Sequence, residues 1–415
     1  MTDIQTVAKS SLQEGTFKIL WDGGLTTPKG YRANGLHCGL RKKQVDLGWI
    51  YSDVPAKACG VYTTNTFQAA PLLVTKESIQ VEQMLQAVLV NSGNANACTG
   101  EEGLTNAYLT REKLAAQFGL PEHFVSVVST GVIGQQLPIK KLVDGITKME
   151  KNTSDIEAFE TAILTTDTVT KHLAVQVQIE GKTVSIGGAA KGSGMIHPNM
   201  ATMLGFVTTD ANVVQEDLDA ALKELTDVTF NMITVDGDTS TNDMVLVLAN
   251  GLAGNQVLSK NHPEWESFKK GLAFVFEGLA KKIARDGEGA TKLIEVKVSG
   301  ANEVAEAQAI AKSIVGSSLV KTAVFGTDAN WGRVICAVGY SGKPIDPNKI
   351  TVSMGAVKVV EGGCPLQFDE EEAKKELEKD TVQIFVELYQ GNETAIAWGC
   401  DLTYDYVKIN AMYRT

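Results

Sequence analysis

The chain has 415 residues, 44% of them hydrophobic, which is enough for two or three domains with large buried cores. Its 38 basic and 49 acidic residues give a net charge of -11, which argues against a general nucleic-acid or acidic-membrane surface. The first residues lack an apolar signal-peptide core, and no stretch reaches about 18 uninterrupted apolar residues. We therefore expect a cytoplasmic protein with no membrane or nucleic-acid partner.

The cysteines are scattered singly along the chain. No C-x-x-C pair and no Cys/His cluster with metal-ligand spacing occurs among them. We expect buried free thiols, no disulfide and no metal site. The six are Cys38, Cys59, Cys98, Cys336, Cys364 and Cys400.

The first third of the chain alternates short apolar runs with loops rich in Gly, Asn and Thr. The runs at 61–62, 71–74 and 87–90 predict short strands. Two strand-like runs, AVLV and FVSVV, are followed by the small, polar loops NSGNANACTG and STGVIG. Loops of this kind can present backbone N–H groups to a ligand.

Helices are predicted where apolar residues recur at helical spacing. LTREKLAAQFG closes on Gly119, SDIEAFETAIL opens with Ser154 and Glu157 at capping-box spacing, and QEDLDAALKEL is amphipathic. Further helices are expected at 262–284, 303–316 and 369–380. Strand-like runs at 291–300, 321–328, 333–340, 381–389 and 395–411 interleave with them, so an α/β fold is predicted throughout.

Three motifs can be set aside. DGDTSTND, residues 236–243, opens like a calcium loop, but Thr241 stands where Gly is needed and Val247 where Glu is needed. GGAAKGSG, residues 187–194, lacks the spacing of a phosphate-binding loop. His197 precedes a proline and is interpreted as a turn or packing residue rather than a base.

KGSGMIHPNMATML, residues 191–204, places Thr202 at the head of an apolar run. A Thr hydroxyl becomes an effective nucleophile when its own α-amine is free to act as the base, because that amine has a pKa of about 8. An internal Thr reaches this state if its hydroxyl attacks the preceding carbonyl and the resulting ester hydrolyses, which would cut the Ala201–Thr202 bond. From the pattern alone, the commoner interpretation is that Thr202 only begins a buried strand, because an internal Thr is far more often structural.

Acyl transfer also needs hydrogen-bond donors for an oxyanion. Thr130 and Gly131, directly after the FVSVV run, offer a hydroxyl and a Gly N–H in one small turn. They are candidates for an oxyanion hole, although an ordinary glycine turn is an equally good interpretation of the pattern.

Several separated stretches, in the same order, closely resemble the ArgJ family, the ornithine acetyltransferases (glutamate N-acetyltransferases) of arginine biosynthesis. The resemblance spans almost the whole chain. The stretches are GYRANGLHCGLRKK, YSDVPAKACGVYTTN, NSGNANACTG, STGVIG, TTDT, KGSGMIHPNMATML, VDGDTSTND, GTDANWGR and NAMYRT.

The resemblance implies self-cleavage into an α chain, 1–201, and a β chain, 202–415, that stay associated as an α2β2 assembly. Thr202 is then the acetyl-accepting nucleophile, with Thr130 and Gly131 as the oxyanion hole. The substrate contacts carried over by motif are Thr168, Lys191, Thr202, Glu288, Asn410 and Thr415.

The resemblance also implies the substrates and the fold. The acetyl group of N2-acetylornithine moves to Thr202 and then to glutamate in a ping-pong scheme without a cofactor, and acetyl-CoA is a possible second acetyl donor. The expected fold is an α/β (α+β) sandwich of α/β/β/α type, like that of N-terminal-nucleophile aminopeptidases, with a smaller α/β part at about 286–415.

Two alternatives remain open from the sequence. The protein could be an amide hydrolase or aminopeptidase with Thr202 as its nucleophile, if water reached the acyl-enzyme more readily than an amino-acid acceptor. The chain could also be a non-catalytic amino-acid-binding protein in which Thr202 is never cut.

Overall fold

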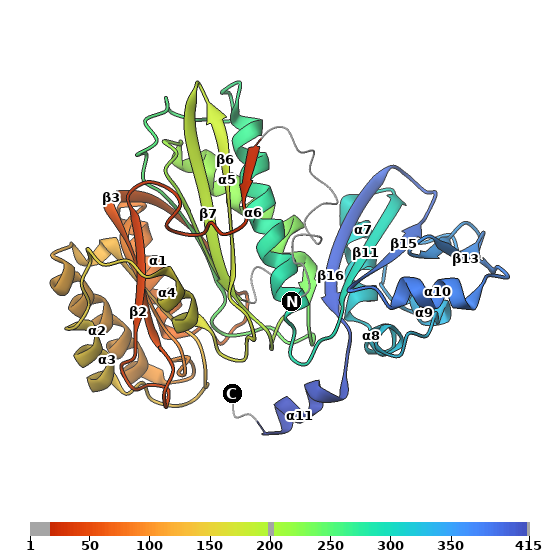
Figure 1. Ribbon diagram of the computed structural model, residues 1–415, viewed down its shortest axis with the longest axis horizontal. Helices are drawn as coiled ribbons and strands as arrows, with labels where there is room; N and C mark the ends of the chain where they lie inside the picture. Colours follow the sequence, from red (N-terminus) through yellow and green to blue (C-terminus); the bar gives the residue numbers. More distant parts are fainter. Residues whose placement is uncertain (1–16, 198–202, 413–415) are drawn as a thin grey trace.

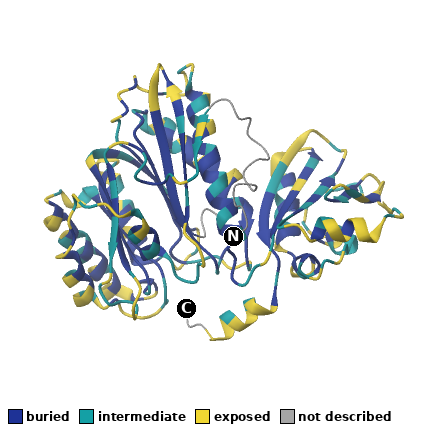
Figure 2. Ribbon diagram, viewed as in Figure 1, coloured by how far each residue is buried: buried dark blue, intermediate teal, exposed yellow. Residues whose placement is uncertain are grey.

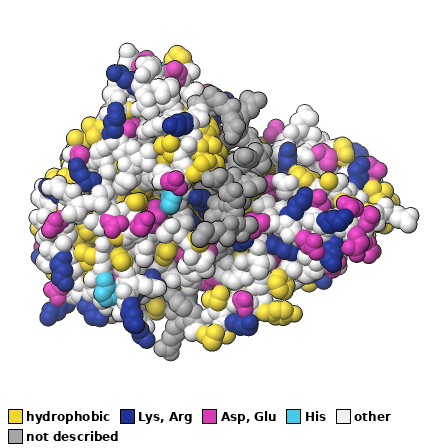
Figure 3. Space-filling view, viewed as in Figure 1, with side chains coloured by type: hydrophobic (Ala, Val, Ile, Leu, Met, Phe, Trp, Pro, Cys, Tyr) yellow, Lys and Arg dark blue, Asp and Glu magenta, His cyan; other side chains and the backbone are white. Residues whose placement is uncertain are grey.

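The computed structural model describes residues 17–197 and 203–412. Two mixed β-sheets stand side by side, and the last helix, α11, lies beneath them (Figure 1). The strand interiors are buried, while α11 and the outer helices carry most of the exposed residues (Figure 2). Basic and acidic side chains are interspersed over the face shown in Figure 3.

The first sheet contains nine strands among the described residues, in the order β1-β6-β7-β8-β10-β3-β4-β5, with β2 paired to β3. The pairs β8–β10 and β4–β5 are parallel, and the others are antiparallel. The strands are β1 (Phe17–Leu20), β2 (Tyr31–Leu36), β3 (Leu47–Tyr62), β4 (Met84–Asn91), β5 (Val125–Ser129), β6 (Lys171–Ile179), β7 (Lys182–Lys191), β8 (Leu204–Thr209) and β10 (Met244–Ala249).

The second sheet has the order β14-β13-β12-β15-β11-β16-β9. Apart from β9, all of its strands follow residue 292 in the sequence. They are β9 (Ile233–Thr234), β11 (Leu293–Ala301), β12 (Thr351–Met354), β13 (Val357–Glu361), β14 (Cys364–Pro365), β15 (Thr381–Glu387) and β16 (Glu393–Cys400).

Helices lie around and between the two sheets (Figure 1). They are α1 (Ala70–Glu82), α2 (Gly100–Phe118), α3 (Ile139–Ile146), α4 (Ile156–Ile163), α5 (Gln215–Val228), α6 (Trp265–Arg285), α7 (Val304–Gly316), α8 (Ser318–Phe325), α9 (Trp331–Gly339), α10 (Glu370–Leu377) and α11 (Tyr404–Met412), with short 3₁₀ turns η2 (Glu122–Phe124) and η3 (Phe230–Met232).

Side chains along the long strand β3 alternate between the two faces of the first sheet, and this alternation explains the layers around that sheet. Trp49 joins an apolar cluster with α1, α2 and α3, whereas Ile50 joins a cluster that β8, β10 and α4 complete. A bulge follows Tyr51, and beyond it Val61 joins a third apolar cluster, with residues of α5 and α6. The bent sheet thus folds one half over the other, which gives the α/β/β/α sandwich that the sequence predicted.

Helix α6 lies between the two sheets and packs against β6, β7 and β16. Its Lys281 is 3% exposed and pairs with Glu277 at 2.7 Å and with Glu295 of β11 at 3.2 Å. The charge of the buried Lys281 is therefore compensated by two carboxylates, and its contact with Glu295 links α6 to the second sheet.

The structure corrects four strand predictions. Residues 71–74 lie in α1, 321–328 begin in α8, 333–340 lie mostly in α9, and 404–411 form part of α11. Short apolar runs fit a buried strand and a buried helix equally well, so periodicity alone could not separate them. The cap of α4 is also different, because Asp155 rather than Ser154 accepts a hydrogen bond from the Ala158 N–H.

The other predicted helices and the remaining strands are present, which confirms the α/β fold class. The six cysteines are free thiols, but Cys98, Cys336 and Cys364 are exposed, so the prediction of burial was wrong for these three. No helix among the described residues is long and apolar enough to span a membrane.

Candidate active site

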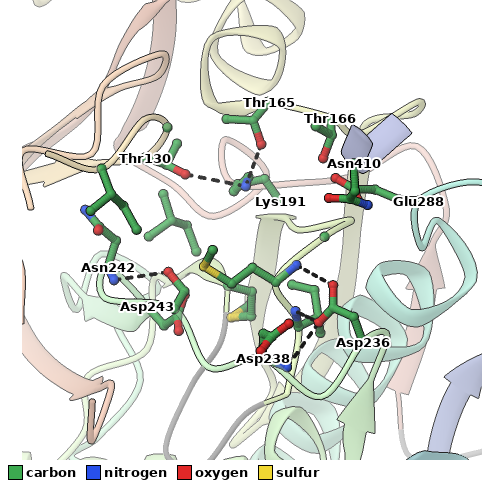
Figure 4. Close-up of a pocket in the computed structure, with 18 of the residues that line it drawn as sticks. Thr130, Thr165, Thr166, Lys191, Asp236, Asp238, Asn242, Asp243, Glu288 and Asn410 are labelled. Atoms are coloured by element: carbon green, nitrogen blue, oxygen red, sulfur yellow. Dashed lines mark hydrogen bonds between the residues drawn. The ribbon is translucent and has the colours of Figure 1, made fainter. Parts of the chain in front are cut away.

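A cavity lies where the loops after β5 and β7 meet the loop after β9 and the helix α11 (Figure 4). Its volume is about 830 Å³, including the space at its open mouth. Its described lining residues come from distant parts of the sequence. They are Thr130, Gly131, Ile133, Thr165, Thr166, Lys191, Gly194, Met195, Ile196, Met203, Leu204, Asp236, Asp238, Ser240, Asn242, Asp243, Glu288, Tyr406 and Asn410.

The predicted oxyanion turn forms one wall of the cavity. The parallel strands β4 and β5 end at the same edge of the sheet, so the loops after them meet. Gly131 has a φ of 136°, and a Cβ there would lie 2.4 Å from the Gly93 carbonyl carbon and 2.5 Å from the Asn94 nitrogen. Only glycine fits this close approach of two loops.

Asn242 fixes this turn from the other side. Its Nδ2 donates to the Ala95 carbonyl at 2.6 Å and to the Ser129 carbonyl at 2.8 Å. Ser129 donates in turn to Asn91 at 2.6 Å. The turn is thus held by side-chain amides, which keeps the Thr130 hydroxyl and the Gly131 N–H in place.

Lys191, the last residue of β7, extends into the cavity beside the oxyanion turn (Figure 4). Its ammonium group donates to the Thr165 hydroxyl at 3.0 Å and to the Thr130 hydroxyl at 3.5 Å. The carboxylate of Asp167 lies 3.9 Å away. A positive group therefore stands next to the proposed oxyanion donors, where it can bind a carboxylate.

Lys191 lies next to a buried network of charged side chains. Lys171 is paired with Asp167 at 2.7 Å and with Asp286 at 2.6 Å. Burial by itself would raise the pKa of Asp167, but the ammonium groups of Lys171 and Lys191 hold it well below its usual value. Asp167 also accepts the Gly192 N–H at 2.6 Å, which fixes the backbone next to Lys191.

Thr168 belongs to this network and does not line the cavity. Its N–H and hydroxyl both donate to Asp286, the N–H at 3.1 Å. Thr165 and Thr166, three and two positions earlier, line the cavity. The TTDT motif thus reaches the cavity through Thr165 and Thr166, and the substrate contact at Thr168 stays a prediction.

The opposite side of the cavity is acidic. Glu288, Asp236 and Asp238 line it, and Asn410 of α11 donates to Glu288 at 2.7 Å. The pKa of Tyr406 is raised by burial and by the carboxylates of Asp236, Glu288 and Asp238 around it. Together with Lys191, this arrangement gives the cavity one cationic and one anionic pole.

Asp243 is a buried carboxyl group in the cavity wall. It is 4% exposed, and its Oδ2 has no hydrogen-bond partner among the described residues. Burial raises the pKa of Asp243 well above its usual value, and the nearby Lys191 offsets only part of this effect.

His197 is not placed as a base, in keeping with its interpretation as a packing residue. Thr234 donates to the Ile196 carbonyl at 3.1 Å, so the His197 Nδ1–H donates to the Thr234 oxygen at 3.0 Å. Burial, together with the cation of Lys312, lowers the pKa of His197 to about 4. The ring is therefore neutral at physiological pH.

Thr202, Ala201 and Thr415 lie outside the described residues. Met203, which follows Thr202 in the sequence, lines the cavity, and its carbonyl accepts the Met244 N–H at 2.9 Å. No cluster of three metal-ligating side chains occurs within 17–197 and 203–412.

The sequence missed the supporting residues. Lys171 looks like an ordinary strand lysine, and its partner Asp286 is 115 positions away. Asp167 lies in the TTDT motif, and Asp236 and Asp243 lie in DGDTSTND, residues 236–243, which we call the acidic loop. The only sequence signal for these three residues was their presence in motifs of the family.

The sequence pattern of the ArgJ family matches residues 32–415. The arginine biosynthesis bifunctional protein ArgJ of Geobacillus kaustophilus is 60% identical over 396 residues, covering 95% of this chain and 97% of that protein. The protein of the same name from Oceanobacillus iheyensis is 58% identical over 397 residues, covering 96% and 98%.

A solved structure is similar as well. The crystal structure of arginine biosynthesis bifunctional protein ArgJ from Bacillus halodurans has a TM-score of 0.50 and 58% identity, and it covers 51% of this chain and 100% of that chain. The sequence matches confirm the predicted resemblance. The chain therefore belongs to the ArgJ family and is an enzyme of that family.

Proposed function

We propose that the chain, an enzyme of the ArgJ family, transfers the acetyl group of N2-acetylornithine to glutamate through an acetyl ester of Thr202. One observation carries the proposal: five residues predicted from separate motifs, Thr130, Gly131, Lys191, Glu288 and Asn410, line a single cavity. Membership of the family, whose curated relatives are named as bifunctional proteins of arginine biosynthesis, supports it.

Self-cleavage of the Ala201–Thr202 bond comes first in this scheme. The Thr202 hydroxyl attacks the Ala201 carbonyl, the acyl group passes from nitrogen to oxygen, and water hydrolyses the ester. Two observations support this step: Met203 lines the cavity, and the solved Bacillus halodurans chain covers about half of this chain, the extent of either cleavage product.

In the first half-reaction, the freed α-amine of Thr202 accepts the hydroxyl proton as the oxygen attacks the acetyl carbonyl. The Thr130 hydroxyl and the Gly131 N–H donate to the developing oxyanion. Ornithine leaves with the proton. In the second half-reaction, the amine of glutamate attacks the acetyl ester, and Thr202 is regenerated with N-acetylglutamate as the product.

The two poles of the cavity suit the proposed substrates. Lys191 offers an ammonium group to an α-carboxylate, and Glu288 offers a carboxylate to the side-chain ammonium of ornithine. Thr415 remains a proposed contact from the family resemblance. Thr168 would first have to release Asp286, which its hydroxyl now contacts.

The remaining parts of the proposal come from the family resemblance. The products of cleavage form an α2β2 assembly, the enzyme is cytoplasmic, and the reaction needs no cofactor. The name bifunctional given to the relatives favours acetyl-CoA as a second donor of the acetyl group to glutamate.

Initial rates of acetylglutamate formation at varied N2-acetylornithine and glutamate test the function. The proposal predicts parallel double-reciprocal lines and no activity in a Thr202→Ala variant. Release of free acetate at the same rate with and without glutamate would instead identify an amide hydrolase. A wild-type chain that is uncut and inactive would favour a binding protein.

A further inference from the structure

The segment from Thr234 in β9 to Met244 at the start of β10 contacts the chain on both sides of residues 198–202, which themselves lie outside the described residues. On the downstream side, Met244 at the start of β10 donates its N–H to the Met203 carbonyl. On the upstream side, residues 234–239 contact residues 195–197. The sequence motif DGDTSTND falls within this segment.

Asp236 makes the principal upstream contacts. Its carboxylate accepts the Met195 N–H at 2.7 Å and the Ile196 N–H at 2.9 Å, so that one charged group holds two consecutive backbone donors. Figure 4 shows Asp236 close to Asp238, with dashed lines that mark hydrogen bonds to its carboxylate. Hydrogen bonds to a charged acceptor are about twice as strong as neutral ones.

The backbone that Asp236 holds is strained. Met195 has a φ of 56°, a left-handed conformation that costs a residue with a side chain about 1 kcal/mol or more. Just before it, Gly194 packs closely on Glu288, because a Cβ at Gly194 would lie 2.3 Å from the Glu288 carboxyl carbon. The carboxylate of Asp236 offsets the strain at Met195.

Neutral contacts complete the upstream attachment. The Val235 N–H donates to the Ile196 carbonyl at 2.7 Å, and the Thr239 hydroxyl donates to the His197 carbonyl at 2.8 Å. The chain is therefore fixed as far as His197, four residues before the proposed scissile bond. Fixing the flanks of a short segment reduces the conformations through which a hydroxyl and a carbonyl must find each other.

We infer that Asp236 is a positioning residue for self-cleavage, which holds the upstream flank of the Ala201–Thr202 bond in its bent conformation. The inference rests on the proposed function and adds to it a role for the acidic loop. Asp236 takes no proton in this role; it acts through the backbone of Met195 and Ile196.

The test is to follow cleavage of the newly made full-length chain during cell-free synthesis with labelled methionine. Samples are separated on denaturing gels, and the fragments are identified by intact mass. In Asp236→Asn, the side-chain amide has only one acceptor for two N–H donors, so we expect cleavage at least about tenfold slower than in the wild type.

The matched control is Asp210→Asn, which alters a buried carboxylate that also accepts two backbone N–H groups, from Lys29 at 3.0 Å and Ser185 at 2.8 Å, neither of them in 195–197. It should cleave within about twofold of the wild type. Adding Met195→Gly to Asp236→Asn should restore part of the rate, because glycine adopts the left-handed conformation without the carboxylate. A general loss of stability would not be rescued in this way.

Equal rates in Asp236→Asn and the wild type, equal slowing in Asp210→Asn, or no rescue by Met195→Gly would each overturn the inference. If Asp236→Asn fails to fold, Thr239→Val decides, with several-fold slower cleavage expected and an unchanged rate overturning the role of the loop. A wild-type chain that stays uncut would overturn the proposed function, and the inference would fall with it.

Discussion

At the scale of single residues, the site depends on buried charges that compensate one another. Lys171 is the centre of this arrangement, because its ammonium group contacts both Asp167 and Asp286 and none of its side chain is exposed. Asp167 then holds Gly192 and lies near Lys191, so the position of the cavity lysine depends on a residue outside the cavity.

Replacing Lys171 with Met should therefore destabilise the protein strongly. Two carboxylates would lose their nearest cation while staying buried, which costs about 3–5 kcal/mol. Urea unfolding of the variant and the wild type measures this free energy. A loss below about 1 kcal/mol would show that the network is as weak as a surface ion pair.

Asp243 gives a prediction with a defined pH dependence. Its pKa is raised in the folded protein by burial, so the folded state binds the proton more tightly than the unfolded state. The stability associated with this group is present below its unfolded pKa and is lost as the pH rises through the folded pKa.

Asp243→Asn removes the titrating carboxyl group, so the variant does not lose this stability as the pH rises. The melting temperature of the variant, relative to that of the wild type, should rise steadily from about pH 4 to pH 8, starting near the unfolded pKa of an aspartate. Calorimetry over this pH range checks the trend. A difference in melting temperature that does not change with pH would contradict the buried, high-pKa carboxyl group.

At the scale of elements, the oxyanion turn is the part of the site most sensitive to shape. In Gly131→Ala, the new methyl group would meet the backbone of Gly93 and Asn94, so the two loops must separate. We expect kcat to fall by about 100-fold or more, because a displaced donor no longer reaches the oxyanion.

Gly134→Ala in the same loop is the matched control. Its φ is also positive, at 77°, but a Cβ there meets no atom within 4 Å. It should lose about 1 kcal/mol of stability and keep nearly normal kcat. Similar kcat values for the two variants would argue against an oxyanion hole at Gly131.

At the scale of the whole molecule, the strand order explains why the two chains proposed to arise by cleavage would stay together. The strands β8 and β10, which follow residue 202, lie between β7 and β3, which precede it. Neither fragment could leave without breaking the centre of the first sheet and its two apolar clusters.

The two fragments should therefore migrate as one species in size-exclusion chromatography and unfold in a single transition. They should separate only under denaturing conditions, and fragments separated in this way should recover little activity when mixed. Dissociation of the fragments in native buffer would contradict the interleaved sheet.

The sequence predicted those parts of the molecule that depend on local patterns. The turn at Thr130 and Gly131 follows a strand directly, and α5 and α6 have clear helical periodicity, so each could be recognised within a few residues. Contacts between distant segments could not be predicted in this way. The ion pair of Lys171 with Asp286 and the hydrogen bond from the Met195 N–H to Asp236 form only when the folded chain brings these segments together.

The family motifs provided the long-range information that local patterns lacked. They assigned Lys191, Glu288 and Asn410 to one site, and the structure places all three at one cavity. The motif TTDT gave the right segment, in which Thr165 and Thr166 line the cavity and Thr168 contacts Asp286. A motif does not show which of its side chains turns inward.

The measurement that tests the central claim most directly is the intact mass of the denatured enzyme after brief mixing with N2-acetylornithine alone. The account predicts a fragment that begins at Thr202 and is heavier by one acetyl group, which disappears when glutamate is added. A cleaved enzyme that turns over acetylornithine and glutamate without ever carrying this acetyl group would contradict the account.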